Sequence, residues 1–259
     1  MKALNRLIVI IFTLCLIVFS VLAPVGIIIT RDVYYINQFK RCGIYPENGT
    51  ISVKYINGDP SLTANLSAEQ LDELAAHMTD YFAHKKQSYS YKMDNVILNG
   101  ETTNGVDIFS EEAASHMDDV RQLFDIVKIA AVICGVLLFA GGLYMLFKKA
   151  TVRAVIYKAS LFTVLGFFAV VAVFLGFCFI KTVADGSFSS ATYFGQIWTS
   201  LHHLFFPFSP DKFSGSFFND TTTQILNQNF FLNTVVTIVI NILAMTSAWL
   251  LSAKLISKR

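Results

Sequence analysis

The chain has 259 residues, of which 54% are hydrophobic and only 15% are charged. A water-soluble domain of this length has no core large enough for so many apolar side chains, so the composition excludes an ordinary soluble protein. The formal net charge of +2 gives no sign of a nucleic-acid partner.

Four apolar runs are long enough, or nearly so, to cross a membrane. They cover about Leu7 to Thr30, Ile129 to Phe147, Ala159 to Ile180 and Leu232 to Leu251. A membrane-spanning helix needs about 20 apolar residues, because each residue adds 1.5 Å across ~30 Å of hydrocarbon. The first run exceeds the roughly 7–15 apolar residues of a cleaved signal peptide, so we expect an uncleaved anchor.

We therefore predict an all-α membrane protein with four transmembrane helices and a small α+β extracytoplasmic domain between the first two. The expected segments are a first helix over residues 1–30, the domain over 31–122, a second helix over 123–147, a basic cytoplasmic loop over 148–158, a third helix over 159–181, an extracytoplasmic aromatic loop over 182–231, and a fourth helix with a cytoplasmic tail over 232–259.

Charge sets the expected orientation of these segments. The two termini and the loop over 148–158 hold nine of the 20 basic residues and none of the 18 acidic ones. Basic residues gather on the cytoplasmic side of membrane proteins. We therefore expect both termini in the cytoplasm, and the domain and the aromatic loop outside it.

The domain over 31–122 has periodic segments of its own. Residues 50–56, "TISVKYI", alternate like a strand, and "SYSYKM" over 88–93 resembles a second one. Residues 66–84 predict an amphipathic helix in which Ser67 and Gln70 form a capping box. Its expected apolar face consists of Leu71, Leu74, Ala75, Met78 and Phe82. We expect His77 and His84, which flank this face, to be solvated.

A second helix is expected to begin at a Ser110 cap and to continue into the second span. On this helix His116 and Asp119 share a face, because residues three apart are neighbours. A carboxylate one turn from an imidazole can accept its N–H, fix its tautomer and raise its basicity. An exposed ion pair is the plainer interpretation of the same spacing.

The loop over 182–231 is crowded with aromatic residues. An aromatic belt at the membrane interface accounts for Trp198, Phe205, Phe206, Phe230 and Phe231. It does not account for the adjacent imidazoles of His202 and His203.

These residues resemble three signatures of the lipoprotein intramolecular transacylases, four-span membrane proteins of low-GC Gram-positive bacteria. The first signature, approximately His-Met-x-Asp-Val-Lys, is similar to "HMDDVR" over 116–121. The second, His-x-(Ile/Leu)-Phe-Phe, matches residues 202–206 and places His202, not His203, on the family histidine. The third is similar to residues 220–231, with departures at Thr221, Asn227 and Gln228.

The resemblance implies an acyl shift within one substrate molecule. The sn-2 acyl chain of a diacylglyceryl-modified lipoprotein cysteine would move to the α-amino group of that cysteine. His116, oriented by Asp119, and His202 would be catalytic, and neither a cofactor nor a metal is implied. The implied partners are diacylglyceryl lipoproteins and membrane lipid. The expected substrate-binding residues are Trp198, Phe205, Phe206, Asp220, Phe230 and Phe231.

Three other functions would use some of the same features. A metal-assisted hydrolase would use His116, His202 and His203, but adjacent histidines bind one zinc ion poorly and no HExxH pattern occurs. A transporter is disfavoured because no charged residue lies deep within an expected span. A non-enzymatic membrane partner or assembly factor, with the outer domain as its binding module, is the main alternative.

The position of His116 adds a geometric requirement. It lies 11 residues before Val127, where the second span is expected to start, which is about 16 Å along a continuous helix. Headgroups reach only some 5–8 Å beyond the hydrocarbon. The site must therefore lie in a pocket roofed by the outer domain, unless the helix tilts or breaks.

Overall fold

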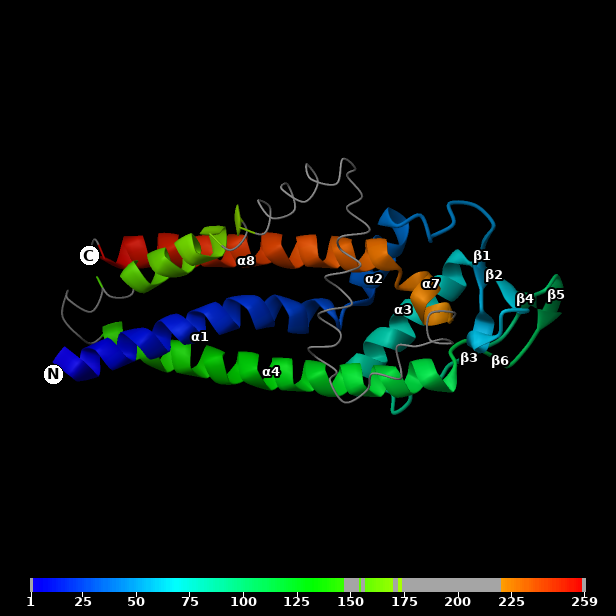
Figure 1. The fold of residues 1–259 in the computed structure, drawn as a ribbon, viewed down its shortest axis with the longest axis horizontal. Helices are drawn as coiled ribbons and strands as arrows, with labels where there is room; N and C mark the ends of the chain where they lie inside the picture. The colour runs from blue at the N-terminus through cyan, green and yellow to red at the C-terminus, as the bar shows by residue number, and fades with distance from the viewer. Residues whose placement is uncertain (1, 147–153, 155–156, 170–171, 174–219, 258–259) are drawn as a thin grey trace. The chain divides into compact units, whose positions relative to one another are not determined.

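The computed structural model describes residues 2–146, 154, 157–169, 172–173 and 220–257 of the chain (Figure 1). Its contacts divide the chain into two compact units. The first, here the membrane unit, consists of Met1–Gly26, Asp125–Ser189 and Val236–Arg259. The second, the α+β unit, consists of Ile27–Phe124 and Ser190–Val235.

Three long helices correspond to the first, second and fourth apolar runs: α1 (Lys2–Ile28), α4 (Glu111–Leu146) and α8 (Gln228–Ser257) (Figure 1). Each contains a stretch long and apolar enough to cross a membrane, namely Arg6–Ile28, Glu111–Tyr144 and Asn229–Ser252. The expected span over 159–181 begins with the apolar helix Tyr157–Ala169, and most of its remainder lies outside the described residues. The protein is therefore a mostly helical membrane protein, with three candidate spans in its described part.

Within the membrane unit, α1 packs closely on α4. Phe12, Leu16 and Leu138 belong to one buried cluster. A Cβ atom added at Gly135 would lie 3.0 Å from the Phe19 ring, so the glycine allows this close approach. Small residues at such contacts are typical of helices packed in a bilayer.

The α+β unit contains short helices and strands around one core. They are α2 (Asp32–Arg41), β1 (Thr50–Lys54), the 3-10 helix η1 (Ile56–Gly58), β2 (Thr63–Ser67), α3 (Ala68–Phe82), β3 (Lys92–Met93), β4 (Val96–Leu98), β5 (Glu101–Thr103), β6 (Val106–Asp107) and α7 (Thr221–Ile225). One antiparallel sheet has the order β1-β2-β4-β5, and β3 pairs with β6 in a second. The small sheet region agrees with the predicted α+β character.

Helix α3 forms as its sequence predicts. The Ser67 side chain accepts from the Gln70 N–H, and Gln70 Oε1 accepts from the Ser67 N–H, which completes the capping box. The predicted apolar face is confirmed, because all five of its residues are buried. The helix ends before His84, which has a φ of +61° and is exposed, an αL termination of a common kind.

The prediction for His77 is wrong. This side chain is only 8% exposed, and its ring centroid lies 4.6 Å from that of Tyr91. Its Nε2 lies 3.0 Å from the carbonyl oxygen of Tyr89. Tyr89 and Tyr91, from a later segment, cover the ring of His77. The helical period of α3 alone does not predict this contact.

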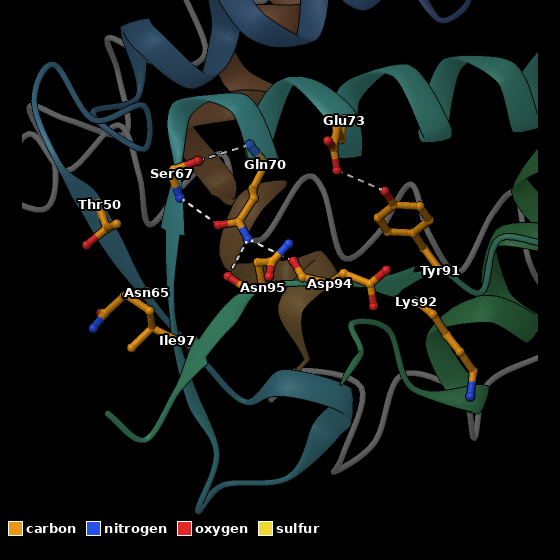
Figure 2. A pocket seen from close by; sticks show the side chains of 10 residues that line it. All are labelled: Thr50, Asn65, Ser67, Gln70, Glu73, Tyr91, Lys92, Asp94, Asn95 and Ile97. Carbon is orange, nitrogen blue, oxygen red and sulfur yellow. Dashed lines mark hydrogen bonds between the residues drawn. The ribbon is translucent and has the colours of Figure 1, made fainter. Parts of the chain in front are cut away.

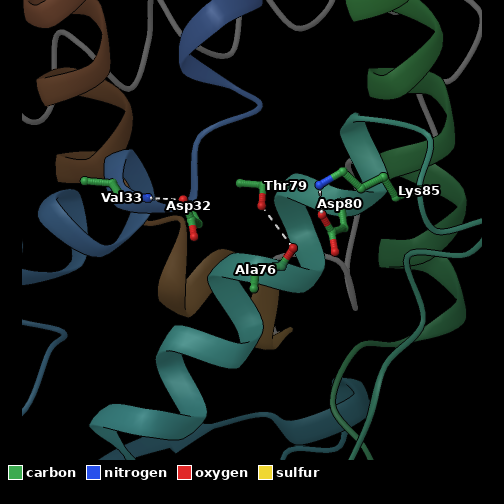
Figure 3. A network of polar contacts seen from close by, with 6 residues as sticks. All are labelled: Asp32, Val33, Ala76, Thr79, Asp80 and Lys85. Atoms are coloured by element: carbon green, nitrogen blue, oxygen red, sulfur yellow. Dashed lines mark hydrogen bonds and ion pairs between the residues drawn. The ribbon is translucent and has the colours of Figure 1, made fainter.

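Local polar contacts close the ends of two helices in the α+β unit (Figure 3). The Asp32 carboxylate accepts from the Val33 N–H at 2.8 Å at the start of α2. Near the end of α3, Thr79 Oγ1 donates to the Ala76 carbonyl at 2.9 Å, and Lys85 pairs with Asp80 at 2.9 Å. These contacts fix the end of α3 that faces α4.

Candidate active site

His116 lies on the second turn of α4, a helix that begins as predicted. Ser110 Oγ accepts from the Ala113 N–H at 3.1 Å, and Glu111 and Glu112 occupy the first turn. Carboxylates there are stabilised by the positive end of the helix dipole. From this cap α4 continues without interruption to Leu146. Of the two expected geometries, the structure thus has the unbroken helix.

The imidazole of His116 is buried, with 3% of its surface exposed. Asp119, one helical turn further along, is half-buried. Neighbouring residues of the same helix, Met117 and Val120, pack on the core of the α+β unit. His116 is therefore not half of an exposed ion pair.

Two further residues of the first signature attach α4 to α3. The Tyr81 hydroxyl donates to the Asp118 carboxylate, and the Arg121 guanidinium lies 4.5 Å from the centroid of the Tyr81 ring. Burial and the neighbouring carboxylate of Asp118 raise the pKa of Tyr81, so its hydroxyl stays protonated and remains a donor. Arg121 also donates to the Gln87 carbonyl at 3.4 Å. These contacts fix the turn that carries His116.

The third signature reaches the same helix through Asp220, which is fully buried. Its Oδ2 accepts from the Ser110 N–H at 2.9 Å, and its Oδ1 accepts from the Thr222 N–H at 2.7 Å. Asp220 thus caps α7 and holds the start of α4, although 110 residues separate it from Ser110. This carboxylate thus attaches the third signature to the start of the helix that carries the first signature.

Phe230 and Phe231 lie at the start of α8. Phe230 is 4% exposed and packs among the rings of Tyr34, Tyr35 and Phe39, with centroid distances of 5.7–6.4 Å. Phe231 is half-buried. The Asn227 side chain accepts from the Phe230 N–H at 3.0 Å and so caps α8. This cap gives the departure from the third signature at Asn227 a structural role.

The second signature lies outside the described residues. This applies to His202 and to its neighbours Trp198, His203, Phe205 and Phe206. The meeting of His116 with His202 therefore stays a prediction. Across the described ranges, no group of three or more His, Cys, Asp or Glu side chains is placed to hold a metal ion.

Comparisons with known proteins agree with these observations. A family model described as lipoprotein intramolecular transacylase Lit matches residues 7–231. The solved structure of the membrane integral lipoprotein intramolecular transacylase Lit from Bacillus cereus aligns with a TM-score of 0.65 at 15% identity, covering 100% of this chain and 98% of that chain. Identity this low shows a shared fold and no more. A search of curated proteins found no match.

The family match covers most of the chain and includes all three signatures. Asp220 of the third signature holds Ser110 at the start of α4, the helix that carries the first signature and the buried His116. The chain is a membrane-integral acyltransferase and belongs to the lipoprotein intramolecular transacylase (Lit) family.

Proposed function

We propose that this protein moves the sn-2 acyl chain of a diacylglyceryl-modified lipoprotein cysteine to the α-amino group of the same cysteine. The product is an N-acyl, S-monoacylglyceryl lipoprotein. The observation that carries the proposal is a buried His116 on the polar half of a membrane helix, held by residues of two family signatures.

The charges along α4 support a site at the membrane surface. Asp118, Asp119, Arg121, Asp125 and Lys128 lie in its first half, and no charged residue follows from Ile129 to Leu146. Eighteen uncharged residues span roughly 27 Å, about the thickness of the hydrocarbon. On this basis His116 stands on the order of 20 Å outside the hydrocarbon along the helix, so the reacting headgroup must be drawn towards the α+β unit.

The reaction needs a base more than it needs a driving force. The amine and the ester belong to one molecule, so correct orientation supplies a large part of the roughly 7–11 kcal/mol available from effective molarity. The α-amino group, with a pKa of about 7.7–8.0, is mostly an unreactive ammonium at neutral pH. A histidine with an ordinary pKa of about 6.5 is suited to remove its proton.

The proposed step balances as an ester aminolysis. The ammonium first loses one proton through a histidine to solvent. The neutral amine nitrogen then attacks the sn-2 ester carbonyl and loses a second proton to one histidine. The carbonyl then re-forms as the bond to the glyceryl oxygen breaks, and that oxygen receives a proton from a histidine. An amide and a free glyceryl hydroxyl result. We assign these proton transfers to His116, oriented by Asp119, and to His202.

The other predicted site residues divide between two roles. Trp198, Phe205, Phe206 and the half-buried Phe231 are assigned to the migrating acyl chain. Phe230 packs within the protein and supports Phe231, whose ring centroid lies 5.7 Å away. Both oxygens of Asp220 accept backbone N–H groups, so we assign this residue a positioning role at the start of α4.

Mass spectrometry of lipoprotein N-termini tests the proposed activity. Lipoproteins would be isolated from a host that lacks N-acylation, with and without this protein, and their N-terminal lipopeptides would be fragmented. We expect an amide-linked chain and a monoacylglyceryl thioether only when the protein is present. A free amine with two ester-linked chains in both samples would reject the activity and favour a non-enzymatic membrane partner.

The proposed orientation places both termini in the cytoplasm and the site outside it. In a variant without its native cysteines, an impermeant thiol reagent applied to intact cells should label Thr102→Cys and Ser214→Cys. Thr151→Cys should react only after the membrane is opened. Labelling of Thr151→Cys in intact cells would overturn the orientation.

A further inference from the structure

The α+β unit contains a polar groove of about 440 Å³, which His116 does not line (Figure 2). One wall is a face of the sheet, where Thr50, Asn65 and Ile97 lie on β1, β2 and β4. The opposite wall comes from the first two turns of α3, including Glu73, and from the segment over 91–95. The volume is in the range of common ligand sites.

Hydrogen bonds within the wall formed by α3 and the segment over 91–95 fix the shape of this groove. Gln70 Nε2 donates to the carbonyl oxygens of Asp94 at 3.3 Å and Asn95 at 3.2 Å, which ties α3 to the segment over 91–95. The Tyr91 hydroxyl donates to Glu73 Oε2 at 3.2 Å (Figure 2). The groove is therefore formed before any ligand enters, which lowers the entropy cost of binding.

The groups that face the groove suit a polypeptide. Among the described residues that line the groove, Figure 2 draws no hydrogen bond between the side chain of Thr50 or Asn65 and the other lining residues. A hydroxyl and an amide can each donate and accept, as a peptide backbone requires. Most lining residues are polar, which does not favour an acyl chain.

The charge of the groove lining favours a basic polypeptide. Glu73 and Asp94 line the groove, and the one cationic lining residue, Lys92, is paired with Asp107 at 3.3 Å. The lining is thus net acidic, which repels a phosphate headgroup and favours lysine or arginine.

The groove lies within reach of His116. Eight residues of α3 separate Glu73 from Tyr81, about 12 Å of helix, and the Tyr81 hydroxyl bonds to Asp118, two residues from His116. In the proposed reaction the modified cysteine is the first residue of its chain, so the polypeptide leaves the site in one direction only. An extended chain covers about 3.3–3.6 Å per residue, so the helical step alone takes about four residues, and the step across the Tyr81–Asp118 contact adds about one or two more.

We infer that this groove binds the polypeptide segment about five residues after the lipidated cysteine, with a preference for basic residues. This inference rests on the proposed function. On this inference the protein recognises both the polypeptide and the lipid of its substrate.

Synthetic diacylglyceryl lipopeptides in vesicles with the full-length protein test it. Three substrates share their first three residues: one continues with lysines at positions five to seven, one carries glutamates there, and one ends at residue three. We expect the lysine substrate to have a KM about twofold to fivefold lower than either of the others, at similar kcat, as for partly exposed ion pairs.

Variants localise the effect to the groove. Asn65→Trp, which fills it, should raise the KM of the lysine substrate to that of the short one and leave the short substrate unchanged. Glu73→Gln should raise the KM of the lysine substrate alone. Lys54→Trp, at the other end of β1, and Glu101→Gln, on β5, serve as matched controls without effect.

The outcomes separate the two proposals. If the wild-type protein N-acylates none of the three lipopeptides, the proposed function fails. If it converts all three with equal KM, or if Asn65→Trp alters the short and the lysine substrate alike, the function stands and the groove proposal is overturned.

Discussion

The two halves of α4 obey opposite rules of burial. In residues 111–128 the charged side chains are exposed or half-buried, and His116 and Met117 are buried at 3% and 6% exposure. In residues 129–146 most large apolar residues are exposed, such as Val136 at 61% and Phe139 at 70%, whereas Leu138 is buried against α1. The environment that suits the side chains of this continuous helix thus changes near Ile129, from water and protein to lipid.

Exposure to lipid matters in the second half of α4, and burial of the imidazole matters in the first half. Such exposed apolar residues are stable only against lipid, because in water a patch of this kind would promote aggregation. The His116 imidazole, in the other half of the helix, is buried among protein groups that fix its position. The lipid-facing segment and the proposed site residue His116 thus belong to one helix. The following predictions test the division between its two halves.

The largest expected effect is loss of the catalytic histidines. His116→Ala and His202→Ala should each lower the rate of N-acylation by about 10²–10⁴, because each removes a proton-transfer group. The double variant should be little worse than either single one, since the two act as a unit. Rates in vesicles at matched protein levels measure this.

His203→Ala is the matched control for that experiment. Neighbours on a helix point about 100° apart, so only one of the two adjacent histidines can face His116 if their segment is helical. We expect this variant to keep substantial activity. An inactive His203→Ala beside an active His202→Ala would show that the register is wrong, and three active single variants would remove the histidines from the mechanism.

A lysine placed on each half of α4 tests the boundary between them. Val136→Lys puts a charge near the middle of the expected span and should cost about 2.5–3.5 kcal/mol of insertion free energy. Gln122→Lys, at an exposed site of the first half, should be nearly neutral. Quantifying the membrane-inserted fraction compares the two, and equal insertion would contradict the division.

The cap at Asp220 should matter less than the histidines but more than an ordinary surface residue. Asp220→Asn replaces one acceptor oxygen by a donor, so one of the two backbone N–H groups loses its partner at a cost of about 1–3 kcal/mol. Ser110→Ala, which removes only the cap of α4, should cost about 1 kcal/mol. Thermal unfolding in detergent measures both, and an unchanged Tm for Asp220→Asn would contradict the buried clamp.

The smallest expected effect concerns His77. Burial lowers the pKa of this histidine, so the folded state favours the neutral ring. The unfolded chain then binds more protons below its ordinary pKa of about 6.5, and stability falls as the pH drops through that range. His77→Gln should flatten this decline between about pH 7 and pH 5. A wild-type stability that rises on acidification would contradict the sign.

The sequence predicts what depends on neighbouring residues. The capping box at Ser67 and Gln70, the buried face of α3 and the unbroken course of α4 follow from local spacing. Helix α2 and the strands of two or three residues from β3 to β6 were missed or only partly anticipated, because elements so short carry no clear period. The burial of His77 and the clamp between Asp220 and Ser110 depend on contacts between distant segments, which no local pattern encodes.

Isotope tracing of the sn-2 chain tests the central claim most directly. Two lipopeptides are mixed in equal amounts in vesicles with the purified protein: one carries a deuterated sn-2 chain, and the other carries a ¹³C-labelled peptide. We predict that every deuterated amide forms on the unlabelled peptide, and that His116→Ala forms neither product. Deuterated chains on the ¹³C peptide, or an amide built from the sn-1 chain, would contradict the account.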